Sequence, residues 1–299
     1  MNGLPLNEII HGDCLEVMRQ FPDKSIDMIL CDLPYGTTRN KWDSIIPLDK
    51  LWEQYERIIK DNGAIVLTAQ TPFDKVLGCS NLKLLRYEWI WNKISPTGHL
   101  NARKMPMKKT ENILVFYKQL PTYNPQGLEY CPRIKKRSSK SIGSSNYGKH
   151  NDEYLSEYKG YPTNLLEFMR ESGLHPTQKP VALFEYLIKT YTNEGEIVLD
   201  NCIGSGTTAI ACINTGRNFI GVEIEEKYVK IARERIEKHK KLDKMRLFPI
   251  SELEAGKLQY KGLYEPEDEA DKEAKRIAAA TWNKNHPKNP VTSKPHKKK

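Results

Sequence analysis

Apolar runs alternate with stretches of helical periodicity in the first 118 residues. A buried strand is expected where apolar and β-branched residues run together, and a helix where apolar residues recur every three or four positions. The expected elements, in order, are a strand at residues 25–32, a helix at residues 48–60, and strands at residues 64–68, 87–91 and 112–117. The Asn62-Gly63 pair is expected to end the helix.

The same alternation returns after residue 173. The expected elements are a helix at residues 181–191, a strand at 196–200, a helix from Thr207, a strand at 218–223 and a helix at 227–240. This order is typical of a mostly parallel sheet with helices on both faces. Residues between the two stretches have no clean period, and those near the end are only weakly helical. We therefore predict an α/β domain formed by residues 1–118 and 173–241, an inserted region at 119–172 and a C-terminal extension at 242–299.

Composition narrows the class of protein. The 299 residues are 38% hydrophobic and 28% charged, which is ordinary for a globular protein and excludes collagen-like and fully disordered chains. The longest apolar runs fall short of the ~20 residues that cross a bilayer. The first residues lack the layout of a signal peptide, so a soluble cytoplasmic protein is expected. The six cysteines form no Cys-x-x-Cys pair and have no His partner at zinc spacing, so no metal site is expected.

Positive charge is concentrated in one segment. The formal net charge is +9, and residues 103–140 hold ten basic against two acidic residues. A localised basic surplus is compatible with a polyanionic partner such as DNA, although a solvated basic face is the alternative. The expected phosphate contacts are Arg103, Lys104, Lys108, Lys109, Arg133, Lys135, Lys136 and Arg137. The Lys-rich last fifteen residues are interpreted as a solubilising tail, with a non-specific DNA tether as the alternative.

A glycine-rich turn at residues 200–209 (DNCIGSGTTA) lies between an expected strand and an expected helix. Gly204 and Gly206 would let a ligand approach the backbone, and the helix N-terminus offers free N–H groups. Glu223, nineteen residues after Gly204, is placed to accept hydrogen bonds from ribose hydroxyls. By itself this pattern also fits a dinucleotide site or a capped helix after a tight turn.

A second turn, Asp32-Leu33-Pro34-Tyr35-Gly36, directly follows a strand. An exocyclic amine on a nucleobase is a poor nucleophile because its lone pair is delocalised into the ring. The carboxylate of Asp32 and the carbonyl of Leu33 could each accept one amine hydrogen, and Tyr35 could stack on an extruded base. For an isolated turn of this kind, a purely structural role is the alternative.

Three motifs in one order resemble the amino-DNA methyltransferases that use S-adenosylmethionine (SAM). The motifs are Asp32-Leu-Pro-Tyr-Gly, His175-Pro-Thr-Gln-Lys-Pro180 and the 200–208 turn. Their order is similar to that of the β class, a circular permutation of the usual methyltransferase order. The resemblance implies a Rossmann-like class I fold with a mostly parallel seven-stranded sheet, in which the strands around Trp89 and Asn112 form the edge hairpin. It also implies that residues 119–172 are the target-recognition region.

The resemblance also implies roles for individual residues. Asp32, Leu33, Pro34 and Tyr35 would be the catalytic tetrapeptide, and Leu33 stands where the family usually has proline. The implied cofactor-binding residues are Asp13, Cys14, Thr177, Lys179, Asp200, Cys202, Gly204, Gly206, Thr207 and Glu223. Among these, Asp13 would contact the adenine of the cofactor, Glu223 its ribose, and Thr177 and Lys179 its carboxylate. Cys202 stands where the family usually has phenylalanine.

The implied reaction is direct methyl transfer to a base in double-stranded DNA, without a covalent enzyme–base intermediate. Because residue 32 is Asp rather than Ser, adenine N6 is the favoured acceptor. Cytosine N4 and a catalytically inactive DNA-binding relative remain the alternatives. A homodimer and a cognate restriction enzyme are candidate partners. All of this requires the turn at Asp32 and the turn at Gly204 to lie side by side, although about 170 residues separate them.

Overall fold

The computed structural model of the chain describes residues 3–36, 44–136, 153–171 and 178–246. Its contacts divide the chain into the units Met1–Leu242 and Asp243–Lys299. The second unit lies outside the described residues apart from the last turn of one helix, so the fold described below is that of the first. Within the described ranges, no helix is long and apolar enough to cross a membrane.

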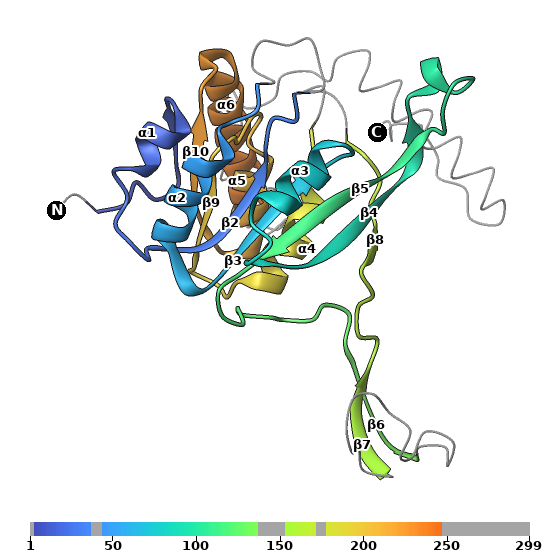
Figure 1. Cartoon of the computed structure of the whole chain (residues 1–299). Coiled ribbons are helices and arrows are strands. Elements are labelled where there is room, and N and C mark those ends of the chain that lie inside the picture. The colour runs from blue at the N-terminus through green and yellow to red at the C-terminus, as the bar shows by residue number, and fades with distance from the viewer. Residues whose placement is uncertain (1–2, 37–43, 137–152, 172–177, 247–299) are drawn as a thin grey trace, which may run out of the picture. The chain divides into compact units, whose positions relative to one another are not determined.

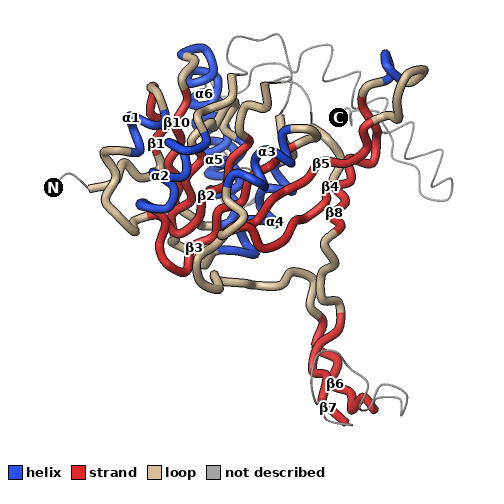
Figure 2. The backbone as a smooth tube through the Cα atoms, in the orientation of Figure 1, coloured by secondary structure: helices blue, strands red, loops and turns tan. Residues whose placement is uncertain are grey.

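Among its described residues, the first unit contains an eight-stranded sheet. Figure 2 draws all strands as red tube, those of this sheet and those of a separate two-stranded pair. The order of the eight-stranded sheet is β1 (Glu8–His11), β10 (Asn218–Glu223), β9 (Ile197–Asp200), β2 (Ile26–Asp32), β3 (Ile59–Ala69), β5 (Lys108–Phe116), β4 (Leu85–Thr97) and β8 (Leu165–Glu167). Neighbouring strands are parallel except at β5, which is antiparallel to both β3 and β4. The α/β class and the mostly parallel sheet are therefore confirmed.

The expected count of seven strands is wrong by one. The six strands expected by residue range are present and β1 is the seventh, but β8, from the stretch 119–172, adds an eighth by pairing parallel with β4. The strands around Trp89 and Asn112 do form an antiparallel pair, yet β8 and not this pair is the edge of the sheet. β8 has three residues, of which only Leu166 is buried, and such a strand is too short to show a period of two.

Helices cover both faces of the sheet (Figure 1). The helices are α1 (Cys14–Met18), α2 (Leu48–Ile58), α3 (Phe73–Ser80), α4 (Val181–Tyr191), α5 (Thr207–Thr215) and α6 (Glu226–Arg246), with a short 3₁₀ turn, η1 (His99–Asn101). On β2, Met28 and Leu30 pack in one core with α4, α5 and α6. Ile29 and Cys31 point the other way and pack with α1, α2 and α3. β2 is thus a central strand that is buried on both faces.

The boundary between α2 and β3 differs from the sequence expectation. The helix ends at Ile58, and β3 begins at Ile59 without a connecting loop. Gly63 does not end the helix but lies inside β3. A Cβ atom at this position would meet the backbone oxygen of Asp27 at 2.7 Å, so glycine allows β3 to approach β2 closely.

Two further strands form a separate antiparallel pair, β6 (Glu129–Lys136) and β7 (Glu153–Lys159). Arg133 and Lys135 are two positions apart on β6, so their side chains lie on the same face of this hairpin. The rings of Tyr130 and Tyr158 meet edge to face across it, with centroids 5.6 Å apart. The hairpin lies within the stretch expected to be an insert.

Candidate active site

The two chemistry-bearing turns meet at one edge of the sheet. Asp32 is the last residue of β2 and Asp200 the last residue of β9, and the two strands are parallel neighbours. Ligands of open α/β sheets bind in the crevice outside such strand ends. A cavity of about 630 Å³ lies here, and both Asp32–Tyr35 and Cys202–Ser205 line it. The expectation that these turns lie side by side is therefore confirmed.

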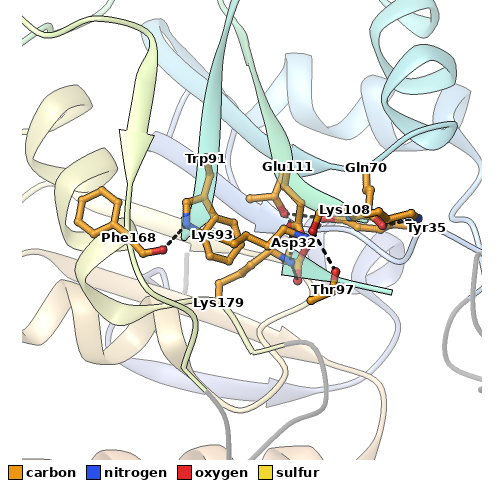
Figure 3. A network of polar contacts seen from close by, with 11 residues as sticks. Asp32, Tyr35, Gln70, Trp91, Lys93, Thr97, Lys108, Glu111, Phe168 and Lys179 are labelled. Carbon is orange, nitrogen blue, oxygen red and sulfur yellow. Dashed lines mark hydrogen bonds and ion pairs between the residues drawn. The ribbon is translucent and has the colours of Figure 1, made fainter. Parts of the chain in front are cut away.

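The carboxylate of Asp32 is held by three donors. Its Oδ1 accepts hydrogen bonds from the hydroxyls of Tyr35 (2.7 Å) and Thr68. Its Oδ2 accepts one from the ammonium of Lys179, also at 2.7 Å. Thr68 lies directly across from Asp32 in the pairing of β2 with β3. The carboxylate is thereby fixed in orientation at the cavity wall (Figure 3).

Tyr35 has a partner for its ring as well as for its hydroxyl. The ring stacks on that of Phe73, with centroids 5.4 Å apart, and the Lys179 ammonium lies 5.5 Å from its centroid. Burial and the charge of Asp32 raise the pKa of the Tyr35 phenol well above its usual value, so the hydroxyl stays a neutral donor. Stacking of Tyr35 on a base stays a prediction, as does the acceptor role of the Leu33 carbonyl. The Leu33 side chain is buried in the core.

Four charged side chains form a chain beside the cavity (Figure 3). From the Asp32 carboxylate, the contacts pass through Lys179 to Glu111 (3.4 Å) and from Glu111 to Lys93 (2.7 Å). The side chains are 23%, 6%, 12% and 3% exposed, in that order. Burial alone would lower the pKa of Lys179, but the charges of Asp32 and Glu111 outweigh it and raise that pKa above its usual value. Lys179 therefore stays an ammonium.

Glu223, which also lines the cavity, holds the glycine turn. Its carboxylate accepts hydrogen bonds from the backbone N–H groups of Gly204 and Glu225, both at 2.9 Å. Burial raises the pKa of Glu223. Gly204 and Gly206 adopt positive φ angles of 52° and 85°, which favour glycine. A Cβ atom at Gly204 would meet no atom within 4 Å, so open space lies beside its backbone.

Asp200 fastens the same turn to α5. Its carboxylate accepts hydrogen bonds from the Thr208 hydroxyl and from the backbone N–H of Cys202. Burial raises the pKa of Asp200 to about 7. The neighbouring Thr207 also lines the cavity, and its hydroxyl lies 3.4 Å from the backbone oxygen of Lys179.

Asp13 and Cys14 also line the cavity. Asp13 is the N-cap of α1, and its Oδ1 accepts hydrogen bonds from the backbone N–H groups of Leu15 and Glu16. Cys14, Cys31 and Cys202 lie close together, and burial raises the pKa of the Cys31 thiol to about 12. A thiol with so high a pKa is a poor nucleophile, which agrees with the expectation that Cys31 only packs in its strand. Among the described residues, no three His, Cys, Asp or Glu side chains group as a metal site would require.

The comparisons with known proteins decide the family. A family model described as a DNA methylase of the N6/N4 class matches residues 26–234. The DNA adenine methyltransferase YhdJ of Escherichia coli (strain K12) is 31% identical over 253 residues, which cover 79% of this chain and 84% of that protein. The chain belongs to the N6/N4 DNA methylase family.

Other relatives of this DNA methylase agree. The type II methyltransferase M2.DpnII of Streptococcus pneumoniae is 28% identical, with 77% of this chain and 89% of the relative covered. The crystal structure of the M1.HpyAVI-SAM complex matches with a TM-score of 0.54 at 28% identity, over 76% of this chain and 98% of that one. The cytosine-N4-specific PvuII DNA methyltransferase, at 18% identity and a TM-score of 0.57, shares the fold.

Lys93, Glu111 and Thr68 of the DNA methylase were not anticipated from the sequence. A signal for Lys93 was present, because it continues the alternation of Trp89 and Trp91, both buried on β4. Glu111 pairs with Trp91 in the register of β5 with β4, a fact that no local pattern contains. Lys179 was anticipated as a contact for the cofactor carboxylate. In the structure its ammonium lies on Asp32 and near Glu111, and the expected role stays a prediction.

The expected DNA contacts fall into two groups. Arg103 and Lys104 lie in the turn after η1 and are exposed, as are Lys108 and Lys109 at the start of β5. The ammonium of Lys108 donates to Gln70, which lines the cavity, so Lys108 lies at the cavity edge. The second group lies on β6, which contains the exposed Arg133 and Lys135 together with Lys136. The remaining expected site residues, Arg137 and Thr177, lie outside the described residues.

Proposed function

We propose that this DNA methylase transfers a methyl group from SAM to the exocyclic N6 of adenine at specific sites in double-stranded DNA. The observation that carries the proposal is the shared cavity of the Asp32 turn and the Gly204 turn. Donor carbon and acceptor nitrogen must touch, and this cavity is the place where both turns could present them. The likeness to the adenine methyltransferase YhdJ and to a SAM complex supports the same reading.

The cavity suits SAM in size and in chemistry. Its volume of about 630 Å³ falls in the usual range for small-molecule sites, roughly 300–1,000 Å³. The open space beside Gly204 gives a ligand access to the backbone, and the Glu223 carboxylate could accept hydrogen bonds from ribose hydroxyls. Asp13 and Cys14 would hold the adenine end of SAM, and Thr177 and Lys179 its carboxylate. When bound, SAM supplies an electrophilic methyl group on a positively charged sulfur.

The Asp32 turn would activate the target amine. The carboxylate of Asp32 and the backbone carbonyl of Leu33 would each accept one amine hydrogen, which localises the nitrogen lone pair for attack. Positive charge then develops on the nitrogen, and the fixed carboxylate stabilises it without reorienting. Tyr35 and Thr68 donate to Asp32 and keep its orientation. Asp32 would act as an acceptor for the amine hydrogen, and the proton would leave to solvent.

Two surfaces would contact DNA. Lys108 lies at the cavity edge, where it could contact phosphates near an extruded base, and Arg103, Lys104 and Lys109 would add phosphate contacts beside it. Residues 119–172, which contain the β6–β7 hairpin, would be the target-recognition region, and residues 1–118 with 173–241 the catalytic domain. In this proposal the motif order is the circularly permuted one of the β class.

A nucleoside analysis tests the proposed reaction. Unmethylated plasmid DNA is incubated with the purified protein and SAM, digested to nucleosides and analysed by mass spectrometry. N6-methyldeoxyadenosine is the expected product, whereas N4-methyldeoxycytidine would assign the enzyme to cytosine. DNA binding without any methylated nucleoside would indicate an inactive DNA-binding relative.

We further propose a cytoplasmic location, a homodimer and a cognate restriction enzyme as the setting in which this methylase acts. The M2.DpnII likeness, to a type II methyltransferase, supports the restriction partner. Light scattering of the purified protein tests the dimer. Cleavage of unmodified but not of modified DNA by an extract of the source cells tests the restriction enzyme.

A further inference from the structure

The proposed reaction gives no role to the buried ion pair of Glu111 with Lys93, which lies beside Asp32 and Lys179. Asp32 and Lys179 already form a neutral pair at 2.7 Å, and Glu111 and Lys93 form a second neutral pair at 2.7 Å. Burying an additional ion pair is weak evidence for stability, because desolvation offsets most of the attraction. Its position next to the catalytic carboxylate therefore calls for a functional explanation.

One oxygen of Glu111 is poised to accept a further hydrogen bond. Oε1 of Glu111 contacts the Lys93 ammonium. Oε2 is buried and has no hydrogen-bond partner among the described residues. The Lys179 ammonium lies 3.4 Å from it, well beyond the 2.7–2.9 Å of a charge-assisted hydrogen bond. Buried acceptors are rarely left unpaired, so this oxygen is a vacant acceptor beside the Lys179 ammonium.

Asp32, by contrast, has little acceptor capacity to spare. A carboxylate offers about four lone-pair sites. Tyr35 and Thr68 occupy Oδ1, and Lys179 occupies one site on Oδ2. A target amine must therefore share Oδ2 with a full positive charge. That charge weakens the hold on the amine hydrogen and opposes the positive charge that develops on the amine nitrogen.

We propose that Glu111 is a positioning residue that receives the Lys179 ammonium when the target base enters. The ammonium moves from Asp32 Oδ2 to Glu111 Oε2, and Asp32 Oδ2 becomes free for the amine hydrogen. Lys93 keeps the Glu111 carboxylate in place through Oε1. No proton is transferred and the cluster stays neutral, so only the terminal bonds of one lysine side chain rotate. This inference rests on the proposed function.

Two variants separate the effect of the Glu111 carboxylate from the effect of the Lys93 ammonium. Lys93→Met removes the second ammonium but keeps the Glu111 carboxylate. Lys93→Met/Glu111→Gln removes both charges, so the Lys179–Asp32 pair remains and no unpaired charge is buried. A matched control is Lys60→Met/Asp27→Asn, which removes an ion pair between β3 and β2 that does not line the cavity. Thermal unfolding and calorimetric titration with SAM establish that each variant is folded and binds the cofactor.

Single-turnover methylation is then measured with saturating DNA and SAM. The control should stay within about threefold of wild type, and Lys93→Met is the reference for the double variant because both lack the Lys93 ammonium and only Lys93→Met keeps the Glu111 carboxylate. The Lys93→Met/Glu111→Gln variant should be at least tenfold slower than Lys93→Met, with SAM and DNA dissociation constants unchanged. Removal of an interaction that is made only on the way to the transition state slows the chemical step in this way without weakening binding.

The outcomes separate the two proposals. Equal rates for the two Lys93 variants, with an active wild type, would overturn the role of Glu111 and leave the methyltransferase assignment standing. A wild type that binds SAM and DNA but methylates no base would overturn the proposed function, and this inference with it. A structure with DNA and the inert analogue sinefungin gives a second readout. Lys179 still on Asp32 in that complex would contradict the proposal, whereas Lys179 on Glu111 Oε2 would support it.

Discussion

The Asp32→Asn substitution is the sharpest test of the chemistry assigned to the Asp32 turn. The side-chain shape is kept, and the amide oxygen can still accept from Tyr35 and Thr68. The amide nitrogen, however, replaces the oxygen that faces Lys179, so two donors meet and the negative charge is lost. The target amine then loses the negatively charged acceptor that would stabilise the positive charge developing on its nitrogen.

The magnitude follows from the contacts. Removal of one preorganised electrostatic contact of this kind costs about 10²–10³ in kcat, or about 3–4 kcal/mol of transition-state stabilisation. Orphaning a buried ion-pair partner costs about 3–5 kcal/mol of stability. Here Glu111, 3.4 Å from the Lys179 ammonium, keeps that charge paired, so the loss should be about 1–2 kcal/mol. For a domain of this size that corresponds to roughly 5 °C in Tm.

The assay combines tritiated methyl transfer to DNA with calorimetric titration by SAM, at a temperature well below the transition of the variant. Turnover should fall at least 100-fold, and SAM affinity should change less than threefold. Asp27→Asn is the control, because it lies on the same strand and pairs with Lys60 away from the cavity. Turnover within threefold of wild type would refute the acceptor role of Asp32. A matching loss of SAM binding would instead place Asp32 in the cofactor site.

Three further predictions concern the glycine turn, pH and DNA. Gly206→Ala should lower the free energy of unfolding by about 1–2 kcal/mol, because φ is 85° and the new Cβ would lie 3.2 Å from Ala232; an unchanged urea midpoint would contradict this. Burial raises the folded-state pKa of Asp200 from 3.8 to about 7, so the folded state binds more protons and stability should fall as pH rises from 4 to 7. Asp200→Asn should flatten this part of the Tm–pH profile, and a profile as steep as that of wild type would rule out the assignment. Replacing Arg133 and Lys135 by Gln should reduce the slope of log K for DNA against log salt by about 2. An unchanged slope would show that Arg133 and Lys135 do not contact DNA phosphates.

The sequence predicted the elements whose cause is local. Leu48 to Ile58 is a helix because apolar residues recur on one face, and Val181–Tyr191 follows the same rule after Pro180. The meeting of Asp32 with Gly204 was also predictable, because parallel strands place their carboxyl ends at one edge of the sheet.

The features that depend on pairing between distant segments could not be predicted. Glu111 meets Lys93 only through the register of β5 with β4, and Lys179 lies 147 residues after Asp32 in the sequence. A lysine in a β-rich run is ordinarily solvent-exposed, so the buried Lys93 contradicts the usual preference. The expectation that Gly63 ends a helix is wrong, because glycine is typical both of helix ends and of places where two strands approach closely.

The glycine turn is fastened before any ligand arrives. Glu223 holds Gly204 from one side, and Asp200 holds the backbone of Cys202 and the Thr208 hydroxyl from the other. A molecule that settles here meets a rigid floor, so little of its binding free energy is spent on ordering the backbone. The Glu223 carboxylate keeps lone pairs beyond those that accept from Gly204 and Glu225, so a ligand hydroxyl can bond to it while the floor stays intact.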